Sequence, residues 1–287
     1  MDSSAPAPVS PEAVSFFETH ADEILSPTVI PTGIAALDRL LGGGLRSGGL
    51  TVLVAGTAVG KSALAAQIAC GAAVFALDRA LGPVLFMSYE SSALNLARRM
   101  VAQTADLRDG FSSSGVSRRD EPAARAALVR LARLPIRIEE DREIGVAGVE
   151  KAITNSDPSV VVVDYLGLMG ADGEDDKADL GDKVRALKVL TMERNVAMLL
   201  VAQLSRSANR PDALPTLRDI SVAAIEQHAD TIMLLHRPSA FRPRHIVEQP
   251  DYAEDASTLA VAKSRFAQAG LIEMMWNASR ARFDFGA

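Results

Sequence analysis

The sequence has 287 residues, of which 48% are apolar and 23% are charged, with a formal net charge of -6. This is enough for one large domain or two small ones, and it excludes low-complexity disorder, collagen and a disulfide-stapled secreted scaffold. The single cysteine, Cys70, cannot form an internal disulfide. The acidic balance argues against a protein that coats nucleic acid with its whole surface, although it leaves room for a local basic loop.

The first 27 residues are predicted to be an amino-terminal extension, followed by one domain at 28–287. Residues 1–10 are mainly Ser, Ala and Pro and are typical of a mobile tail. Residues 11–25 have the spacing of an amphipathic helix, which ends before Pro27 because a residue preceding proline avoids the helical region. This start of the chain has no signal-peptide pattern, and no run approaches the roughly 18 apolar residues of a membrane span. We therefore expect a cytoplasmic protein without membrane contact.

Short apolar runs alternate with segments of helical spacing from residue 28 onward. The runs are typical of strands buried on both faces and lie at 50–55, 84–89, 160–164, 197–202 and 230–235. The helical segments between them lie at 61–80, 92–105, 121–134 and 179–194. This alternation predicts an α/β domain with a mainly parallel sheet and helices on both faces.

Three further strand-like runs follow one another at the end of the chain without helices between them. They lie at 258–266, 271–276 and 281–285. We expect antiparallel strands that complete the sheet at one edge.

The segment AGTAVGKS, which follows the first predicted strand and opens the next helix, carries the strongest functional signal. A GxxxxGK(S/T) loop wraps phosphates with backbone N–H groups, its lysine meets the terminal phosphates, and its hydroxyl binds Mg²⁺. Ala55 replaces the usual first glycine, which is tolerable if its backbone is not left-handed. We predict an ATP site formed by Ala55, Gly56, Thr57, Ala58, Val59, Gly60, Lys61, Ser62 and Ala63.

A run of four valines ends in Asp164 about a hundred residues later. An apolar run closing on an acidic residue describes a buried strand that presents a carboxylate at its carboxyl end, where open α/β sheets bind ligands. Alone, this pattern is equally typical of a plain strand end. Together with the phosphate loop it predicts that Asp164 and Ser62 hold Mg²⁺.

Two polar residues at the ends of other predicted strands are candidates for the chemistry. Glu90 follows 84–89 and could orient and deprotonate water, although it could also be an ordinary exposed glutamate. Gln203 follows 197–202 and could touch the γ-phosphate, or it could simply be a polar residue leaving a strand.

The chain resembles the motor domain of DnaB-type replicative helicases over about residues 30–283. It contains, in the order seen in that family, the segments IPTGIAALDRLLGGGL, AGTAVGKS, VLFMSYES, VVVVDYLGLM, LVAQLSR, IEQHADTIMLLHR and AKSR. The first of these is also similar to the start of RadA and KaiC ATPases, which share the RecA-like core.

The resemblance implies a RecA-like ATPase that forms a ring, usually of six subunits, with ATP at each subunit boundary. It implies that Glu90 is the catalytic base, that Gln203 senses the γ-phosphate, and that Lys263 and Arg265 reach into the neighbour's site, with Arg265 as the arginine finger. A period of two would place both cations on one strand face with Leu259 and Val261. Such a pair is otherwise more typical of a solvated strand edge.

The family binds single-stranded DNA through loops that face the ring channel, and the loop-like stretch 205–219 stands at the matching position. Its Arg206, Arg210 and Arg218 are predicted to meet the phosphate backbone. In the alternative interpretation, these arginines pair with Asp212 and Asp219 of the same loop.

The resemblance predicts a DnaB-like helicase motor that hydrolyses ATP and moves along single-stranded DNA. Only about 27 residues precede the motor-like part, where the family carries a domain that contacts primase, so contact with primase or a loader is left open. A RadA-like recombination ATPase and a regulatory or scaffold ATPase are the alternatives.

Three other residue types are expected to be structural. Cys70 and Trp276 are interpreted as packing residues, and the four scattered histidines do not indicate a zinc site.

Overall fold

The protein is described here from a computed structural model. The structure describes residues 18–21, 25, 28–105, 107, 110–112, 115–140, 145–170, 179–205, 208, 210–241 and 255–286. The helix expected at 11–25 lies largely outside these residues.

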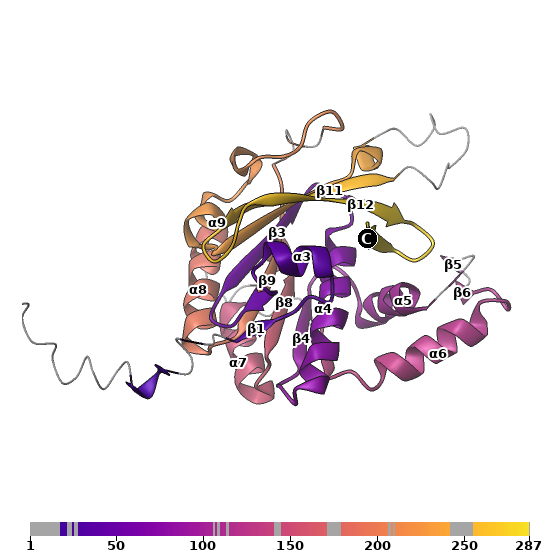
Figure 1. Ribbon diagram of the computed structural model, residues 1–287, viewed down its shortest axis with the longest axis horizontal. Helices are drawn as coiled ribbons and strands as arrows, with labels where there is room; N and C mark the ends of the chain where they lie inside the picture. Colours follow the sequence, from indigo (N-terminus) through magenta and orange to yellow (C-terminus); the bar gives the residue numbers. More distant parts are fainter. Residues whose placement is uncertain are drawn as a thin grey trace, which may run out of the picture.

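The elements follow the predicted order (Figure 1). The strands are β1 (Val29–Ile30), β2 (Leu45–Arg46), β3 (Leu50–Ala55), β4 (Val84–Ser88), β5 (Phe111–Ser112), β6 (Gly115–Val116), β7 (Ile136–Glu139), β8 (Val160–Asp164), β9 (Ala197–Gln203), β10 (Thr231–His236), β11 (Ala256–Ser264), β12 (Gly270–Asn277) and β13 (Arg282–Phe285). The α-helices are α3 (Ala35–Leu40), α4 (Lys61–Asp78), α5 (Ala93–Thr104), α6 (Glu121–Leu131), α7 (Val146–Ser156), α8 (Leu180–Glu193) and α9 (Ala223–His228). The short 3₁₀ turns are η1 (Leu166–Leu168), η3 (Leu217–Asp219) and η4 (Pro238–Phe241).

A nine-stranded sheet runs in the order β13-β12-β11-β10-β3-β9-β8-β4-β7. The pairs from β10 to β7 are parallel, and β11, β12 and β13 add to β10 as an antiparallel edge. This confirms the mainly parallel sheet and its antiparallel edge. The parallel strands therefore end side by side at one edge of the sheet, where the loops that follow them can converge.

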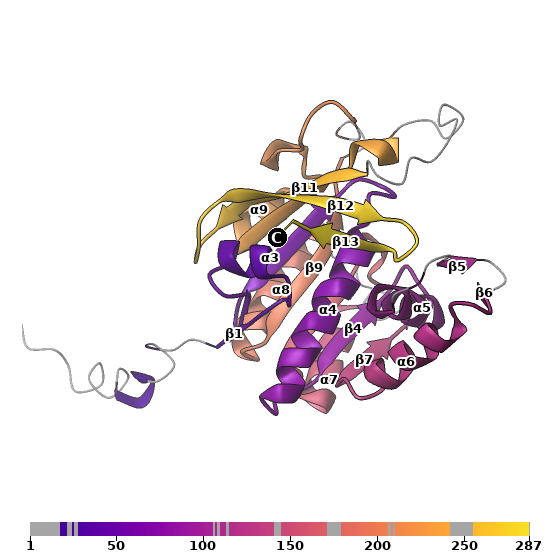
Figure 2. The ribbon, with the colours of Figure 1, turned by 45° about the vertical axis from the view of Figure 1, so that its right-hand side comes forward.

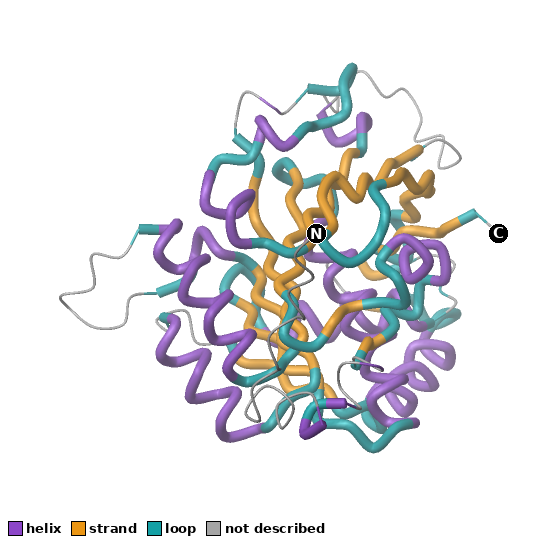
Figure 3. The backbone as a smooth tube through the Cα atoms, turned by 60° about the vertical axis from the view of Figure 1, so that its left-hand side comes forward, coloured by secondary structure: helices purple, strands orange, loops and turns teal. Residues whose placement is uncertain are grey.

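Helices cover both faces of this sheet, as Figures 2 and 3 show. The side chains of β3 alternate between the two faces: Leu53 packs in the same cluster as the buried side of α4, and Val52 packs with α7, α8 and α9. Every residue of β3 and β8 is buried. Burial on both faces explains why these strands are continuous apolar runs rather than alternating ones.

Helix α4 is long and apolar enough to cross a membrane by length and composition alone. Its buried residues nevertheless include Leu64, Ile68 and a series of alanines that lie against the sheet, which is the pattern of a core helix. Cys70 on this helix packs against the same cluster, and burial raises the pKa of its thiol to about 12. This confirms a packing role for Cys70.

The sequence reasoning missed several elements, among them α7 and the edge strand β7. The strand has only four residues, with inward and outward side chains alternating, and therefore lacks the apolar run of a central strand. The segment Val146–Ser156 includes Gly148 and two β-branched residues in its second half, which weaken the helical signal. Val149 and Ile153 bury one face of α7 against the sheet, so tertiary packing stabilises this helix.

Candidate active site

The phosphate loop connects the carboxyl end of β3 to the first turn of α4. Ala58 and Gly60 have left-handed backbones, with φ of 61° and 116°. A Cβ added to Gly60 would lie 2.8 Å from Phe283 Cζ on β13, so glycine is required there for space as well as for conformation. Ala55 is the last residue of β3 and is not among the described residues with positive φ, which explains why alanine can replace glycine at that position.

Arg237, directly after β10, braces the phosphate loop from the side. Its guanidinium donates hydrogen bonds to the carbonyls of Ala58 and Val59, at 2.6 and 3.1 Å, and pairs with Asp255 at 3.3 Å. It also lies 4.9 Å from the ring centroid of Trp276, which confirms Trp276 as a packing residue. Sequence reasoning missed Arg237, because nothing in the local pattern places a strand-end arginine beside a loop almost 180 residues earlier.

Ser62 and Asp164 meet at the carboxyl end of the sheet. The Ser62 hydroxyl donates a hydrogen bond of 3.1 Å to Asp164 Oδ1, while the buried Oδ2 has no hydrogen-bond partner in the described part of the chain. Burial raises the pKa of Asp164, the Ser62 hydrogen bond opposes this, and the charge of Glu90 adds to it. A hydroxyl beside an orphaned carboxylate oxygen fits Mg²⁺, which takes one or two protein oxygens together with phosphates and water.

Glu90 lies just beyond β4 and faces the phosphate-loop lysine. Its Oε2 is 3.6 Å from Lys61 Nζ; the side chain of Lys61 is 8% exposed and that of Glu90 is 45% exposed. Lys61 Nζ also lies 5.0 Å from the ring centroid of Tyr165. The structure thus brings Glu90 to the predicted nucleotide site with its carboxylate open to solvent. Its role as the base stays a prediction.

Arg99 on α5 is a second cation near this site that sequence reasoning missed. One guanidinium nitrogen, Nη1, is buried and has no hydrogen-bond partner among the described residues. Its positive charge lowers the pKa of Asp164, which shows that the two groups are close enough to interact electrostatically. The one sequence feature that could have indicated a buried Arg99 is its position next to Met100, a buried residue of the amphipathic helix α5.

Gln203, the last residue of β9, touches the phosphate loop. Its Nε2 donates a hydrogen bond of 2.7 Å to Thr57 Oγ1, and its backbone carbonyl accepts one of 2.9 Å from the Ser221 hydroxyl. Gln203 therefore bridges the phosphate loop and the segment that leads into α9. This placement suits a γ-phosphate sensor, a role that stays a prediction.

The candidate DNA loop at 205–219 is only partly described, and Arg206 lies outside the described residues. Arg210 pairs with Asp219 at 3.6 Å, as the alternative interpretation of this loop expects. Asp219 also accepts hydrogen bonds from the Thr216 backbone and hydroxyl, and the backbone bond is the main cause that lowers its pKa. Arg218 on η3 is exposed. Of the two predicted DNA contacts that the structure describes, Arg210 has an ion pair and Arg218 has none.

Lys263 and Arg265 lie at the opposite end of the sheet from the phosphate loop. Ser264 at the end of β11 pairs with Thr231 at the start of β10, whereas the phosphate loop follows Ala55, which pairs with Leu235 near the end of β10. Lys263 Nζ donates a hydrogen bond of 2.6 Å to the carbonyl of Glu226 in α9. The structure does not bring these cations to the phosphate loop of the same chain.

The prediction that Lys263 shares a strand face with Leu259 and Val261 is wrong. The register of β11 shifts at Ala262, where one extra residue forms a β-bulge, so Lys263 pairs with Ile232 and Val261 pairs with Met233. Ile232 packs with α7, α8 and α9, while Val261 packs in the cluster of α4. The bulge turns the basic pair to the face covered by α8 and α9, an effect that a strict period of two cannot foresee.

The site thus combines a phosphate loop, a Ser–Asp pair, a carboxylate facing the loop lysine, and an edge amide on one mainly parallel sheet. The chain matches the family described as "DnaB-like helicase C terminal domain" over residues 29–285. The chain belongs to this family.

Curated relatives of this DnaB-like domain are replicative DNA helicases. It is 30% identical over 280 residues to the replicative DNA helicase DnaB of Leifsonia xyli subsp. xyli, covering 94% of this chain and 59% of that protein. It is 29% identical over 282 residues to the replicative DNA helicase DnaB of Treponema pallidum, covering 95% of this chain and 60% of that one. The chain therefore spans about three fifths of the length of these relatives.

Two solved structures share the fold of the DnaB-like domain. One, described as a DnaB-like replicative helicase and its interactions with primase, has a TM-score of 0.75 at 22% identity and covers 95% of this chain and 70% of that one. The other, described as an ATPase domain, has a TM-score of 0.75 at 20% identity and covers 99% of this chain and 100% of that one. These likenesses confirm the predicted fold class, a RecA-like P-loop core.

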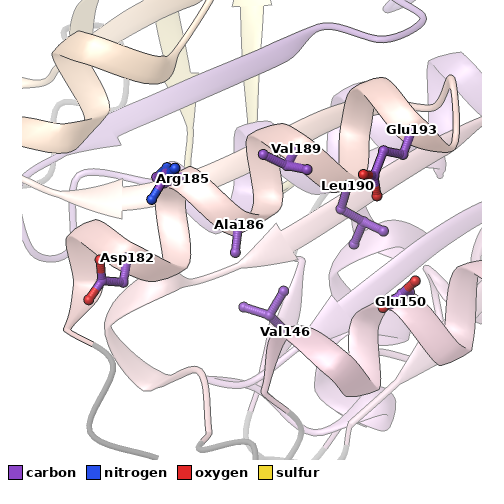
Figure 4. Close-up of a pocket in the computed structure, with 8 residues that line it drawn as sticks. All are labelled: Val146, Glu150, Asp182, Arg185, Ala186, Val189, Leu190 and Glu193. Carbon is purple, nitrogen blue, oxygen red and sulfur yellow. The ribbon is translucent and has the colours of Figure 1, made fainter.

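The DnaB-like domain also has an open groove of about 380 Å³ between α7 and α8 (Figure 4). Apolar side chains line its floor and charged ones its rim; the lining residues are Val146, Glu150, Asp182, Arg185, Ala186, Val189, Leu190 and Glu193. None of them belongs to the candidate site. The described residues contain no cluster of three or more His, Cys, Asp or Glu side chains able to hold a metal ion.

Proposed function

We propose that this chain is an ATP-hydrolysing motor that assembles into a ring, six subunits in number, and moves along single-stranded DNA as a helicase. Membership of the DnaB-like family and the names of the relatives, replicative DNA helicases, support this function. The observation that carries it is the convergence of Lys61, Glu90 and the Ser62–Asp164 pair at one edge of the sheet. We place the activity in the cytoplasm, where the lone thiol of Cys70 stays reduced.

In this proposal the backbone of residues 55–60 and Lys61 bind the phosphates of ATP. Arg237 occupies the carbonyls of Ala58 and Val59, which leaves the N–H groups of the loop as the polar groups that can face an anion. Ser62 and Asp164 would hold Mg²⁺, which neutralises phosphate charge when it is bound. The exposed carboxylate of Glu90 orients the attacking water and accepts its proton at Oε2.

Arg265 serves the nucleotide of a neighbouring subunit, because its own phosphate loop is out of reach. The strand between the register positions Thr231 and Leu235 alone spans about 13 Å, at roughly 3.3 Å per residue. The phosphate loop lies beyond one end and Arg265 beyond the other. An arginine supplied in this way stabilises transition-state charge and is worth about 10³–10⁵ in rate.

Gln203 passes the state of the nucleotide to the DNA loop. Its side chain contacts Thr57 of the phosphate loop, and its carbonyl holds Ser221 at the far end of the loop segment. Loss of the γ-phosphate would change the contact between Gln203 and Thr57, and this change would shift the position of Ser221 through the Gln203 carbonyl.

The test is the ATPase rate with and without single-stranded DNA, run beside a size measurement in ATP. We expect a ring-sized particle, stimulation by single strands, and strand displacement on a forked duplex. A monomer in ATP whose hydrolysis ignores DNA would contradict the proposal. Stimulation without strand displacement would instead favour a RadA-like recombination ATPase.

A regulatory or scaffold ATPase that does not unwind DNA is the second candidate. The observation that favours it is the ion pair between Arg210 and Asp219, which uses one of the predicted DNA contacts within the loop itself. ATP-dependent assembly without any response to single strands would support this candidate, whichever protein partner it controls, a primase or a loader among them.

A further inference from the structure

Asp230, the residue before β10, lies where four parts of the chain meet. Its carboxylate Oδ2 accepts hydrogen bonds from the Leu50 backbone N–H at 2.8 Å and from Lys188 Nζ at 2.7 Å. Its Oδ1 lies 3.4 Å from Arg265 Nη1. The side chain is 4% exposed, so this carboxylate is held among β3, α8 and the end of β11 in a site with little access to water.

The carboxylate of Asp230 does not need Arg265 for its own neutralisation. Lys188, which is itself mostly buried and also bonds the Gly48 carbonyl, supplies a counter-charge at closer range. The Leu50 N–H satisfies the same oxygen. The contact between Asp230 and Arg265 therefore mainly orients the Arg265 side chain, which is the more exposed of the two partners.

Arg265 is bonded through both its backbone and its guanidinium group. Its backbone N–H donates to the Asp230 carbonyl at 2.9 Å, and its Nη2 reaches the Gln227 carbonyl at 3.4 Å. The side chain is still 51% exposed. Both guanidinium contacts are long for charged hydrogen bonds, so the group is oriented while much of it remains available to another ligand.

We propose that Asp230 is the positioning residue for Arg265, aiming its guanidinium at the nucleotide of the neighbouring subunit. This inference rests on the proposed role of Arg265 between subunits. An unrestrained arginine samples many rotamers, and ordering it costs conformational entropy at each catalytic cycle. A buried carboxylate fixed by Lys188 and Leu50 removes much of that freedom before the neighbour's nucleotide arrives.

The same carboxylate fixes the start of the strand that carries the phosphate loop. Leu50 opens β3, and the Asp230 N–H also donates to the Leu50 carbonyl at 2.9 Å. Asp230 thus contacts both Arg265, which we assign to the neighbour's nucleotide, and β3, the strand that leads into the chain's own phosphate loop.

The experiment uses Asp230→Asn and the double variant Asp230→Asn with Lys188→Met. The single variant keeps an acceptor for Leu50 but leaves Lys188 without a counter-charge, which can impair folding. The double variant also removes that uncompensated charge, so it separates positioning from stability. The control is Arg194→Ala, which removes an exposed ion pair with Glu150 at the end of the same helix, α8.

We expect the double variant to bind ATP like the wild type and to hydrolyse it about 10²-fold more slowly, since a displacement of about 1 Å can have an effect of this size. Mixing with Glu90→Gln subunits, which carry an intact Arg265, is expected to restore part of the rate. A merely destabilised subunit would not recover on mixing, so absence of recovery overturns the proposal. Wild-type hydrolysis by the double variant also overturns it, provided that Arg265→Ala is impaired.

The two failures are distinguishable. If Arg265→Ala itself hydrolyses ATP at the wild-type rate, the proposed role between subunits is wrong and this inference falls with it. If Arg265→Ala is impaired and is rescued by Glu90→Gln while the Asp230 variants behave like Arg194→Ala, only the positioning role is wrong.

Discussion

At the carboxyl end of the parallel strands, Lys61 and Asp164 are buried, and one carboxylate oxygen has no partner among the described residues. At the amino end, Arg265 is half exposed, and both it and Lys263 are bonded to backbone carbonyls around α9. In the first region, Asp164 Oδ2 and Arg99 Nη1 have no hydrogen-bond partner among the described residues, and a bound ligand can satisfy such groups. The second is electrostatically satisfied within the chain and can offer its charge outward. We call the first region the receiving end and the second the donating end, after the roles proposed for them.

The largest expected effect comes from removing the lysine of the receiving end. Lys61→Ala should reduce ATP hydrolysis to background, a loss of at least about 10³-fold, because Lys61 is the cation that the proposal assigns to the phosphates, whereas Arg237 bonds the loop carbonyls. Steady-state phosphate release measures this, with circular dichroism as the control for folding. Turnover at the wild-type level would remove the basis of the site assignment.

Arg265→Ala tests the donating end. We expect hydrolysis to fall by about 10³-fold or more while ATP binding is retained, since the role proposed for this arginine is to stabilise the transition state in another subunit. Phosphate release and a fluorescent-nucleotide titration separate the two quantities. Mixing with Glu90→Gln subunits should restore part of the rate, and failure to restore it at any ratio would argue against a shared site.

Asp164→Asn tests whether the receiving end sacrifices stability for function. Because burial raises the pKa of Asp164 in the folded chain, ionisation opposes folding once the pH exceeds the carboxyl's unfolded pKa of about 3.9. Asn should therefore stabilise the nucleotide-free protein at pH 7, by on the order of 1.4 kcal/mol for each unit of the pKa rise. Urea unfolding at pH 7 and pH 3.5 measures the effect.

Most of the gain should be lost at the lower pH, where the aspartate is mainly protonated in both the folded and the unfolded state. A variant that is equally or less stable at pH 7 would show that burial of the Asp164 charge is compensated in the native chain. Hydrolysis should be lost in either case if this carboxylate holds Mg²⁺.

The smallest expected effects concern the candidate DNA loop at 205–219, which belongs to neither end of the sheet. Arg218→Ala should reduce the slope of log affinity against log salt for single-stranded DNA by about 0.7, the value for one phosphate contact. Arg210→Ala should change it less, because Arg210 already pairs with Asp219. Fluorescence anisotropy at several salt concentrations measures both. Equal slopes for Arg218→Ala and the wild type would remove Arg218 from the DNA contacts.

The receiving end was more predictable from the sequence than the donating end, for a physical reason. Its groups follow apolar runs buried on both faces, so Lys61, Asp164 and Gln203 could be assigned to strand and helix ends that the structure confirms. Arg237 and Arg99 were missed because their contacts join distant segments and leave no local period. At the donating end, a single bulge reversed the predicted face of Lys263, and the packing of Asp230 with Lys188 depends entirely on tertiary structure.

The bulge at Ala262 also has a consequence for how copies of the chain can be arranged. In a regular strand, the basic pair would project on the side covered by α3 and α4, with no α9 carbonyls to receive it. If Arg265 serves a neighbouring subunit as proposed, this one inserted residue selects the flank of the subunit that would adjoin the neighbour's nucleotide. A local irregularity in one edge ladder would then decide which surface of the chain takes part in the contact between subunits.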